Sequence, residues 1–149
     1  MNIFFVRPQT YIIYTDGATR LERGVSGLAA IVRDEKGKII HWWCKRDKRM
    51  TCNEAEYAAA IMAFEFLRTL HTNPREVKLF SDSQVMVHQM SGLASARAPA
   101  LRQAQMRLRG LIVQFEKVTF HHIPREKNRL ADALANDAAD GKESNERIA

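Results

Sequence analysis

The sequence predicts an α/β domain built on a mixed five-stranded sheet, in which three antiparallel strands are followed by two parallel strands and helices cover the faces. Three observations predict this class. Short apolar runs separated by turns fill residues 10–44, apolar side chains then recur at helical spacing over residues 53–70, and two later apolar runs are separated by helical stretches. A strand, a helix and another strand in succession require a crossover, which pairs the two strands in parallel.

The first three strands are expected at residues 10–18, 28–33 and 39–44. The first is an apolar run that ends in Asp16 and Gly17, and such a run is typical of a strand buried on both faces. Gly17 is expected to let the backbone turn sharply after the acid. Gly37 occupies the short turn between the second and third strands, which predicts a hairpin.

The next element is a helix over residues 53–70, with Thr51 or Asn53 as its N-cap and Glu54 as an exposed acid of its first turn. The remaining elements are a strand at 77–82, helices at 83–90 and 96–114, a strand at 118–123 and a helix at 128–139. The domain therefore covers residues 10–140, between an N-terminal extension at 1–9 and a polar, disordered tail at 141–149.

Composition narrows the class of protein and of partner. The 149 residues suit one domain, and a net charge of +6 with pI ≈ 9.6 favours a polyanionic partner. Two isolated cysteines, Cys44 and Cys52, argue against a zinc site and against a disulfide scaffold. The N-terminal apolar patch is too short to span a membrane, so we expect a soluble, cytoplasmic monomer with no obligate protein partner.

Four acids fall where a catalytic site would form: Asp16, Glu56, Asp82 and Asp132. Asp16 and Asp82 end strands that are expected to be parallel, and ligands bind at that edge of α/β sheets. Glu56 shares a helix face with small residues that let this face approach the sheet, and Asp132 lies on a polar strip of the last helix. Converging carboxylates repel one another unless cations are present, and Mg²⁺ prefers such oxygen ligands. For each acid alone, a helix cap or a solvated surface charge remains the alternative.

Four motifs carry a resemblance to a known family. They are Tyr14-Thr15-Asp16-Gly17-Ala18, Asn53-Glu54-Ala55-Glu56-Tyr57-Ala58-Ala59, Ser81-Asp82-Ser83-Gln84 and Asn128-Arg129-Leu130-Ala131-Asp132-Ala133-Leu134-Ala135-Asn136. In this order they resemble a type 1 ribonuclease H over residues 10–140, in a short form that lacks the basic handle helix. The resemblance implies the ribonuclease H-like fold and endonucleolytic hydrolysis of the RNA strand of RNA–DNA hybrids, which leaves 5′-phosphate and 3′-hydroxyl ends.

The resemblance also implies roles for individual residues in a two-metal mechanism, with two Mg²⁺ ions per site and Mn²⁺ as a substitute. Asp16 would bridge the ions, Glu56 and Asp82 would hold the ion nearer the leaving 3′ oxygen, and Asp132 would hold the other. The residues expected to contact the hybrid are Gly17, Thr51, Asn53, Gln84 and Asn128. Arg20 and Arg23 are further candidates for contacts with phosphates.

The departures from the family pattern keep other interpretations open. Glu22 and Cys52 stand near positions where the family has asparagine, which motivates a catalytically weak or inactive hybrid-binding protein of the same fold. Another nuclease of the wider superfold and a purely structural α/β domain are further alternatives. His121 and His122 are predicted to be structural strand residues, because the loop that follows them is short.

Overall fold

The computed structural model describes residues 10–70, 73–141 and 146–148. The strands, in chain order, are β1 (Thr10–Arg20), β2 (Val25–Arg33), β3 (Ile39–Lys48), β4 (Glu76–Ser81), β5 (Val118–His122) and β6 (Glu146–Ile148). The helices are α1 (Cys52–Thr69), α2 (Gln84–Met90), α3 (Pro99–Ile112), the short 3-10 helix η1 (Arg125–Lys127) and α4 (Arg129–Ala139). No helix of the described segments combines the length and the apolar character needed to cross a membrane.

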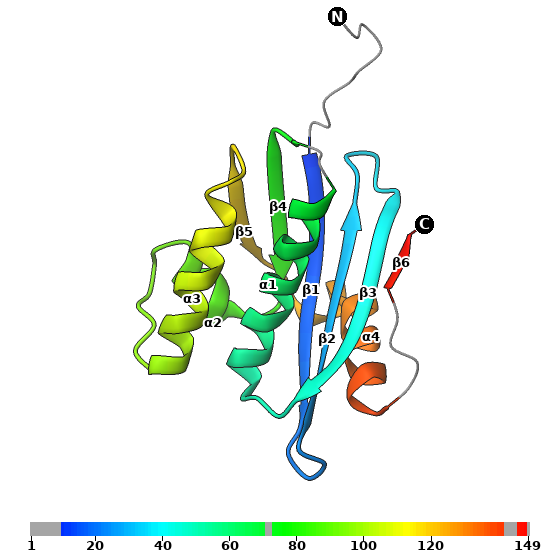
Figure 1. Cartoon of the computed structure of the whole chain (residues 1–149), viewed down its shortest axis with the longest axis vertical. Helices are drawn as coiled ribbons and strands as arrows, with labels where there is room; N and C mark the ends of the chain where they lie inside the picture. The colour runs from blue at the N-terminus through cyan, green and yellow to red at the C-terminus, as the bar shows by residue number, and fades with distance from the viewer. Residues whose placement is uncertain (1–9, 71–72, 142–145, 149) are drawn as a thin grey trace, which may run out of the picture.

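All strands join one sheet in the order β5-β4-β1-β2-β3-β6. β1, β2 and β3 pair antiparallel, whereas β1, β4 and β5 pair in parallel, so the predicted mixed sheet of five strands is confirmed. Figure 1 shows α1 and α3 in front of this sheet and α4 behind it. The two faces are therefore covered unequally.

β1 continues to Arg20, two residues beyond the predicted end at residue 18. β1 pairs with β4 only as far as Tyr14, but its pairing with β2 continues to Arg20. Gly17 remains inside the strand opposite Leu28 and is not among the glycines with positive φ, so the predicted sharp turn is wrong. The long hairpin with β2 supplies the hydrogen bonds that keep β1 extended. Asp16 nevertheless lies where β1 separates from β4.

α1 begins at a capping box rather than at Asn53. The Thr51 hydroxyl accepts a hydrogen bond from the Glu54 backbone at 3.1 Å, and the Glu54 carboxylate accepts one from the Thr51 backbone at 3.1 Å. Glu54 is thereby used at the helix start, as expected for an acid beside unpaired N–H groups. This assignment fixes the direction of Glu56, which is two residues further along α1 and buried.

The main core lies between the sheet and the helices α1 to α3, where Ile13, Phe64 and Leu79 are fully buried. On the other face, Ala135 and Ala138 of α4 pack on Ala29 of β2. The connection between α2 and α3 contains no helix, so the short form without a handle helix is confirmed.

The ends of the chain are described only in part. The predicted extension at residues 1–9 lies outside the described residues, as do 142–145 and 149 of the predicted tail. Glu146–Ile148 form β6 instead of an irregular tail and pair antiparallel with β3. β3 is the last strand of the antiparallel part, so its outer edge offers backbone groups for this pairing.

Candidate active site

A cleft of about 400 Å³ opens at the edge of the sheet where β1 and β4 separate, and all four predicted acids border it. Asp16, Glu56 and Asp82 each place one carboxylate oxygen within 4.8 Å of the others. Asp132 is outside this group of three but borders the same cleft. Acids that are far apart in the sequence thus gather in one place, and we call this site the acidic cleft.

Asp16 and Glu56 are the buried members, with 4% and 8% of their surfaces exposed. Burial, followed by the nearby charge of Asp16, raises the pKa of Glu56 to about 10. Burial is also the largest influence on Asp16, and together with the charges of Asp82 and Asp132 it raises the pKa of Asp16 to about 7. The backbone N–H of Gly17 donates to Asp16 Oδ1 at 2.9 Å and orients this carboxylate.

Asp82 follows the last residue of β4 and is half-buried. Burial raises its pKa, whereas a hydrogen bond from Asn128 and the positive charges of Arg125 and His122 oppose the rise. The hydroxyls of the flanking serines shape this corner. Ser81 Oγ accepts from the Ser83 backbone at 3.0 Å, and Ser83 Oγ accepts from the Met86 backbone at the start of α2. Asp82 is therefore held at a tight junction between strand and helix.

Asp132 is positioned by two donors. Asn136, one turn later on α4, donates to its Oδ1 at 3.2 Å, and Arg125 of η1 donates to the same oxygen at 3.4 Å. Asn136 in turn accepts a hydrogen bond from Arg20 of β1 at 2.6 Å. A chain of side chains from β1 thus fixes the acid on α4.

Arg125 and Asn136 were not identified from the sequence as parts of the site. Asn136 ends the last of the four motifs, and its spacing from Asp132 places both side chains on one helix face. Arg125 lies in the short loop whose brevity suggested that no functional side chain remained there. No local sequence signal identifies it, because its position beside the acids is a tertiary contact.

His122 lies in β5, as predicted, but its side chain has a different environment from that of His121. His121 fits a structural role, because its Nε2 lies 2.8 Å from Thr119 Oγ1 and its ring stacks on Phe80. His122 is instead exposed and borders the acidic cleft. It lies opposite Ser81 at the carboxyl end of β5, so the strand end that bears Asp82 also directs this ring toward the cleft.

Of the five residues predicted to contact the substrate, only Gly17 borders the acidic cleft. Thr51 is occupied as the cap of α1. Asn128 is only 2% exposed and donates to the Thr15 carbonyl at 2.9 Å, so it holds the start of α4 to β1 rather than offering a surface to a substrate. Asn53 is half-buried and Gln84 is exposed, and neither is among the residues that border the cleft.

Arg20 borders the cleft, but its guanidinium is engaged by Asp140 at 2.9 Å as well as by Asn136. This arginine therefore supports α4 and is not held ready for a phosphate. Cys52, the first residue of α1, is exposed and also borders the cleft. The thiol stands where an amide donor was expected from the resemblance.

The sequence is similar to a known protein family and to several curated proteins. The family model described as "Reverse transcriptase-like" matches residues 14–138. Ribonuclease HI of Halobacterium salinarum is 34% identical over 127 residues, which are 85% of this chain and 63% of that protein. Bifunctional protein Rv2228c of Mycobacterium tuberculosis is 31% identical over 130 residues, which are 87% of this chain and 35% of that protein. The chain thus spans less than two thirds of these curated relatives.

Solved structures match over nearly their whole length. The structure of LC11-RNase H1 in complex with RNA/DNA hybrid has a TM-score of 0.82 and 35% identity, and the match covers 87% of this chain and 96% of that one. The N-terminal RNase H domain of Rv2228c from Mycobacterium tuberculosis gives a TM-score of 0.82 at 30% identity, covering 89% and 94% of the two chains.

Proposed function

This chain belongs to the reverse transcriptase-like family and, within it, to the type 1 ribonucleases H, and on that premise we propose that it hydrolyses the RNA strand of RNA–DNA hybrids. The observation that carries the proposal is the convergence of Asp16, Glu56 and Asp82, whose oxygens lie within 4.8 Å of one another. The domain responsible is residues 10–140, acting as a cytoplasmic monomer.

The donor set fits a hard divalent cation. It consists of carboxylates alone, and burial together with the neighbouring carboxylates raises the pKa values of Asp16, Glu56 and Asp82, an effect that a bound cation would offset. Asp16, Glu56 and Asp82 would hold one Mg²⁺ ion, and Asp16 with Asp132 would hold a second, with Mn²⁺ as a substitute. Bound ions of this kind lower the pKa of the attacking water and offset charge on the phosphate.

The side chains of the protein position the groups that react. The Gly17 N–H orients Asp16, and Asn136 with Arg125 fixes Asp132, so the acids need little rearrangement to bind. In the hydrolysis, a water oxygen bonds to phosphorus while the bond from phosphorus to the 3′ oxygen breaks. The water gives up a proton and the 3′ oxygen gains one, which leaves a 5′-phosphate and a 3′-hydroxyl. Arg125 borders the cleft and adds positive charge where the phosphate would lie, and the His122 ring borders the same cleft.

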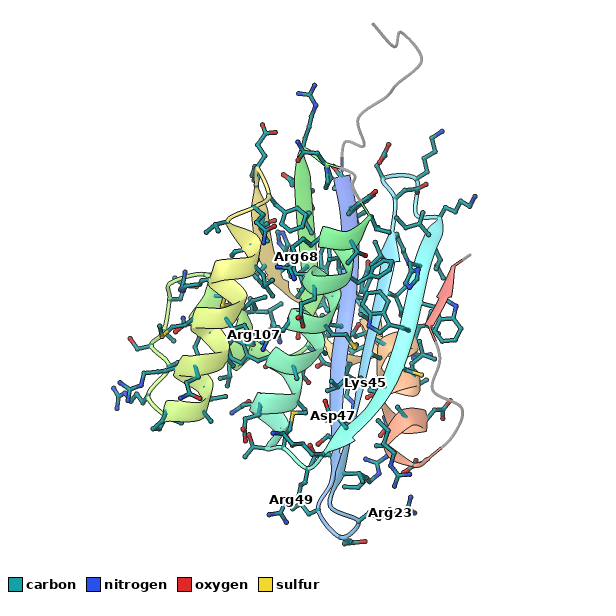
Figure 2. All side chains as sticks on the ribbon, in the orientation of Figure 1. Arg23, Lys45, Asp47, Arg49, Arg68 and Arg107 are labelled. Atoms are coloured by element: carbon teal, nitrogen blue, oxygen red, sulfur yellow. The ribbon has the colours of Figure 1, made fainter. Side chains whose placement is uncertain are left out.

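The end of the molecule beside the cleft carries exposed cations for the hybrid backbone. Figure 2 shows Arg23 and Arg49 projecting from the end that holds the hairpin between β1 and β2. Arg49 also borders a hollow of about 290 Å³ together with Thr51. With a net charge of +6, we expect binding to weaken steeply as salt rises.

The decisive experiment is incubation with labelled RNA–DNA hybrid, duplex DNA and duplex RNA, each with Mg²⁺, Mn²⁺ or a chelator. We expect cleavage of the RNA strand of the hybrid alone, only with metal, and its loss in Asp16→Asn. Binding of the hybrid should persist in this variant, as measured by gel shift.

A catalytically weak or inactive hybrid-binding protein remains the second candidate. Two observations favour it: Glu22 is exposed in the hairpin turn near the cleft, and Cys52 borders the cleft in place of an amide. Hybrid that is shifted in gels but stays intact with Mg²⁺ and Mn²⁺ would select this candidate over the nuclease.

A further inference from the structure

Three aromatic rings form a continuous stack across the part of the sheet that α4 leaves uncovered. Tyr14 of β1 stacks on Phe80 of β4 with ring centroids 5.3 Å apart and an angle of 18° between planes. Phe80 stacks in turn on His121 of β5 at 4.9 Å and 22°. All three side chains are half-buried, whereas Ile13 and Leu79, on the opposite face of the same strands, are fully buried. We call these three residues the aromatic row.

The register of the sheet places the aromatic row directly beside the catalytic acids. Tyr14 is paired with Phe80, and Phe80 with His121, so the row runs straight across three parallel strands. Asp16 and Asp82 come two residues after Tyr14 and Phe80, which in β1 keeps Asp16 on the same face about 7 Å further along. A strand that leaves the acidic cleft on this face would meet the row next.

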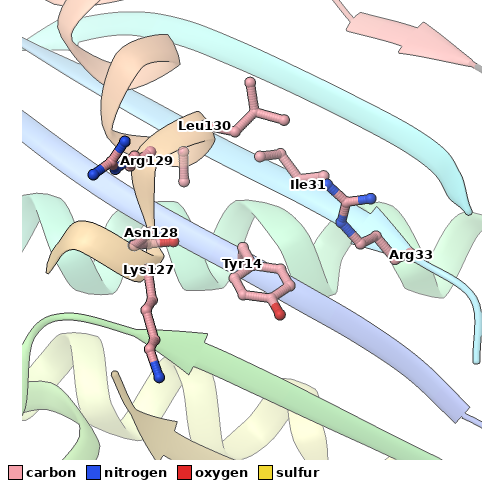
Figure 3. Close-up of a pocket in the computed structure, with 8 residues that line it drawn as sticks. Tyr14, Ile31, Arg33, Lys127, Asn128, Arg129 and Leu130 are labelled. Atoms are coloured by element: carbon pink, nitrogen blue, oxygen red, sulfur yellow. The ribbon is translucent and has the colours of Figure 1, made fainter. Parts of the chain in front are cut away.

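A hollow of about 240 Å³ adjoins Tyr14 and is bordered by cations from two sides. Figure 3 shows Arg33 of β2 on one side of the Tyr14 ring, with Lys127 of η1 and Arg129 of α4 on the other. One nitrogen of Arg33 donates to the Gly37 carbonyl, and Arg129 Nε donates to the Glu126 carbonyl, so both guanidinium groups are held near the hollow.

On the side away from the acidic cleft, cations lie beside the row. Lys78 lies on the same face of β4 as Phe80, two residues earlier. Glu76 also lies on this face, but its carboxylate is already paired with Lys78 at 3.5 Å and with Lys117 at 3.3 Å. Glu126 of η1, next to Lys127, is an exposed acid. The surface therefore offers flat aromatic rings flanked by at least as many cations as acids.

We propose that this open face binds a single-stranded segment of nucleic acid, with bases stacked on the aromatic row and phosphates beside Arg33, Lys127 and Arg129. Stacking needs a base whose flat side is uncovered, which a duplex does not offer, and aromatic rings on a sheet serve this purpose in proteins that bind single strands. The rings alone would suit an apolar partner, but the cations favour a polyanion. The proposal goes beyond the cleavage reaction and does not depend on it.

The test uses the full chain in chelator, so that the acidic cleft holds no metal, and fluorescein-labelled 12-nucleotide RNA and DNA single strands. Fluorescence anisotropy should show binding of the single strands by the unchanged protein. The variant Arg33→Glu with Lys127→Glu should weaken it by about ten-fold or more, since lost phosphate contacts reduce affinity. The matched control is Arg68→Glu with Arg107→Glu, which changes net charge equally at exposed positions of α1 and α3, the helices on the opposite face of the sheet, and should change the affinity less than about three-fold.

Tyr14 variants separate stacking from charge. Tyr14→Leu keeps an apolar side chain and should weaken binding by about five-fold or more, whereas Tyr14→Phe should bind as the unchanged protein does. Circular dichroism and urea unfolding check that each variant is folded. The proposal is overturned if the single strands do not bind, if the control loses as much affinity as Arg33→Glu with Lys127→Glu, or if sedimentation shows a second copy of the chain covering this face.

Discussion

Gly17 lies against the backbone of Ala55 so closely that a Cβ on the glycine would come within 2.7 Å of the Ala55 carbonyl carbon. Each of these residues is the direct neighbour of a buried acid, Asp16 in β1 and Glu56 in α1. The missing side chain therefore allows the approach that brings the two carboxylates together. Glycine is needed here for space rather than for a turn.

Replacement Gly17→Ala should push α1 away from β1 and separate Asp16 from Glu56. We expect hybrid cleavage to fall by about 100-fold, since small displacements of reacting groups have effects of this size, and stability to fall by about 1–3 kcal/mol from overpacking. Single-turnover kinetics and urea unfolding measure both. Gly110→Ala is the control, because nothing lies within 4 Å of its added methyl group and it sits in α3. Equal activity in the two variants would contradict this account.

Stability without metal should fall as pH rises. The pKa of Asp16 in the folded protein is about 7 and that of Glu56 about 10, both above their ordinary values of 3.8 and 4.5. The folded state therefore binds protons that the unfolded chain has released, and this contribution to stability is complete below about pH 4 and is lost as pH rises through the folded values. Urea unfolding in chelator across this range measures the decline.

Glu56→Gln should remove most of that decline, because it replaces the acid with the largest shift by a neutral side chain of similar shape. Added Mg²⁺ should stabilise the unchanged protein more at high pH, since binding requires deprotonated carboxylates. A metal-free protein whose stability rises steadily from pH 5 to 8, about the range where Asp16 titrates, would refute the assignment.

Asn136→Ala should release Asp132 from one of its two donors. We expect the Mg²⁺ concentration for half-maximal activity to rise and turnover to fall by about ten-fold, as for partners that orient metal ligands elsewhere. The KM for hybrid should stay near its original value, because Asn136 is not proposed to touch the substrate. Gln103→Ala, at an exposed position of α3, should change neither quantity.

The cations beside Asp82 should set the acidic limb of the pH–rate profile. Arg125 and His122 both lower the pKa of Asp82, so replacing either by alanine should let that pKa rise and move the limb to higher pH. The same variants should lower turnover at neutral pH by several-fold. Profiles of kcat/KM between about pH 5 and pH 9 measure the shift. An unchanged profile in both variants would contradict this account. It would instead support the structural role predicted for His122 from the short loop that follows it.

The acids could be predicted from the sequence because each one has a local signal. Asp16 ends an apolar run, and Asp82 follows a strand that must be parallel to the first. Glu56 shares a helix face with small residues, and Asp132 lies on a polar strip of the last helix. The features that could not be predicted from the sequence depend on contacts between elements that are far apart in the chain. β1 continues past Asp16 because β2 pairs with it, and Arg125 and His122 face the cleft because β5 ends beside β4. β6 also depends on the open edge of a distant strand.

α4 rests on the sheet through alanines, and Gly27 of β2 leaves just enough room for the backbone at Ala135 and Ala139. Contacts between such small groups bury little apolar surface per residue, so this helix is held more weakly than α1 with its large core side chains. α4 also brings Asp132 to the cleft. Moderate heating should therefore move the Asp132 carboxylate away from the cleft while the sheet is still folded. Activity should then be lost at a temperature below the melting temperature of the protein.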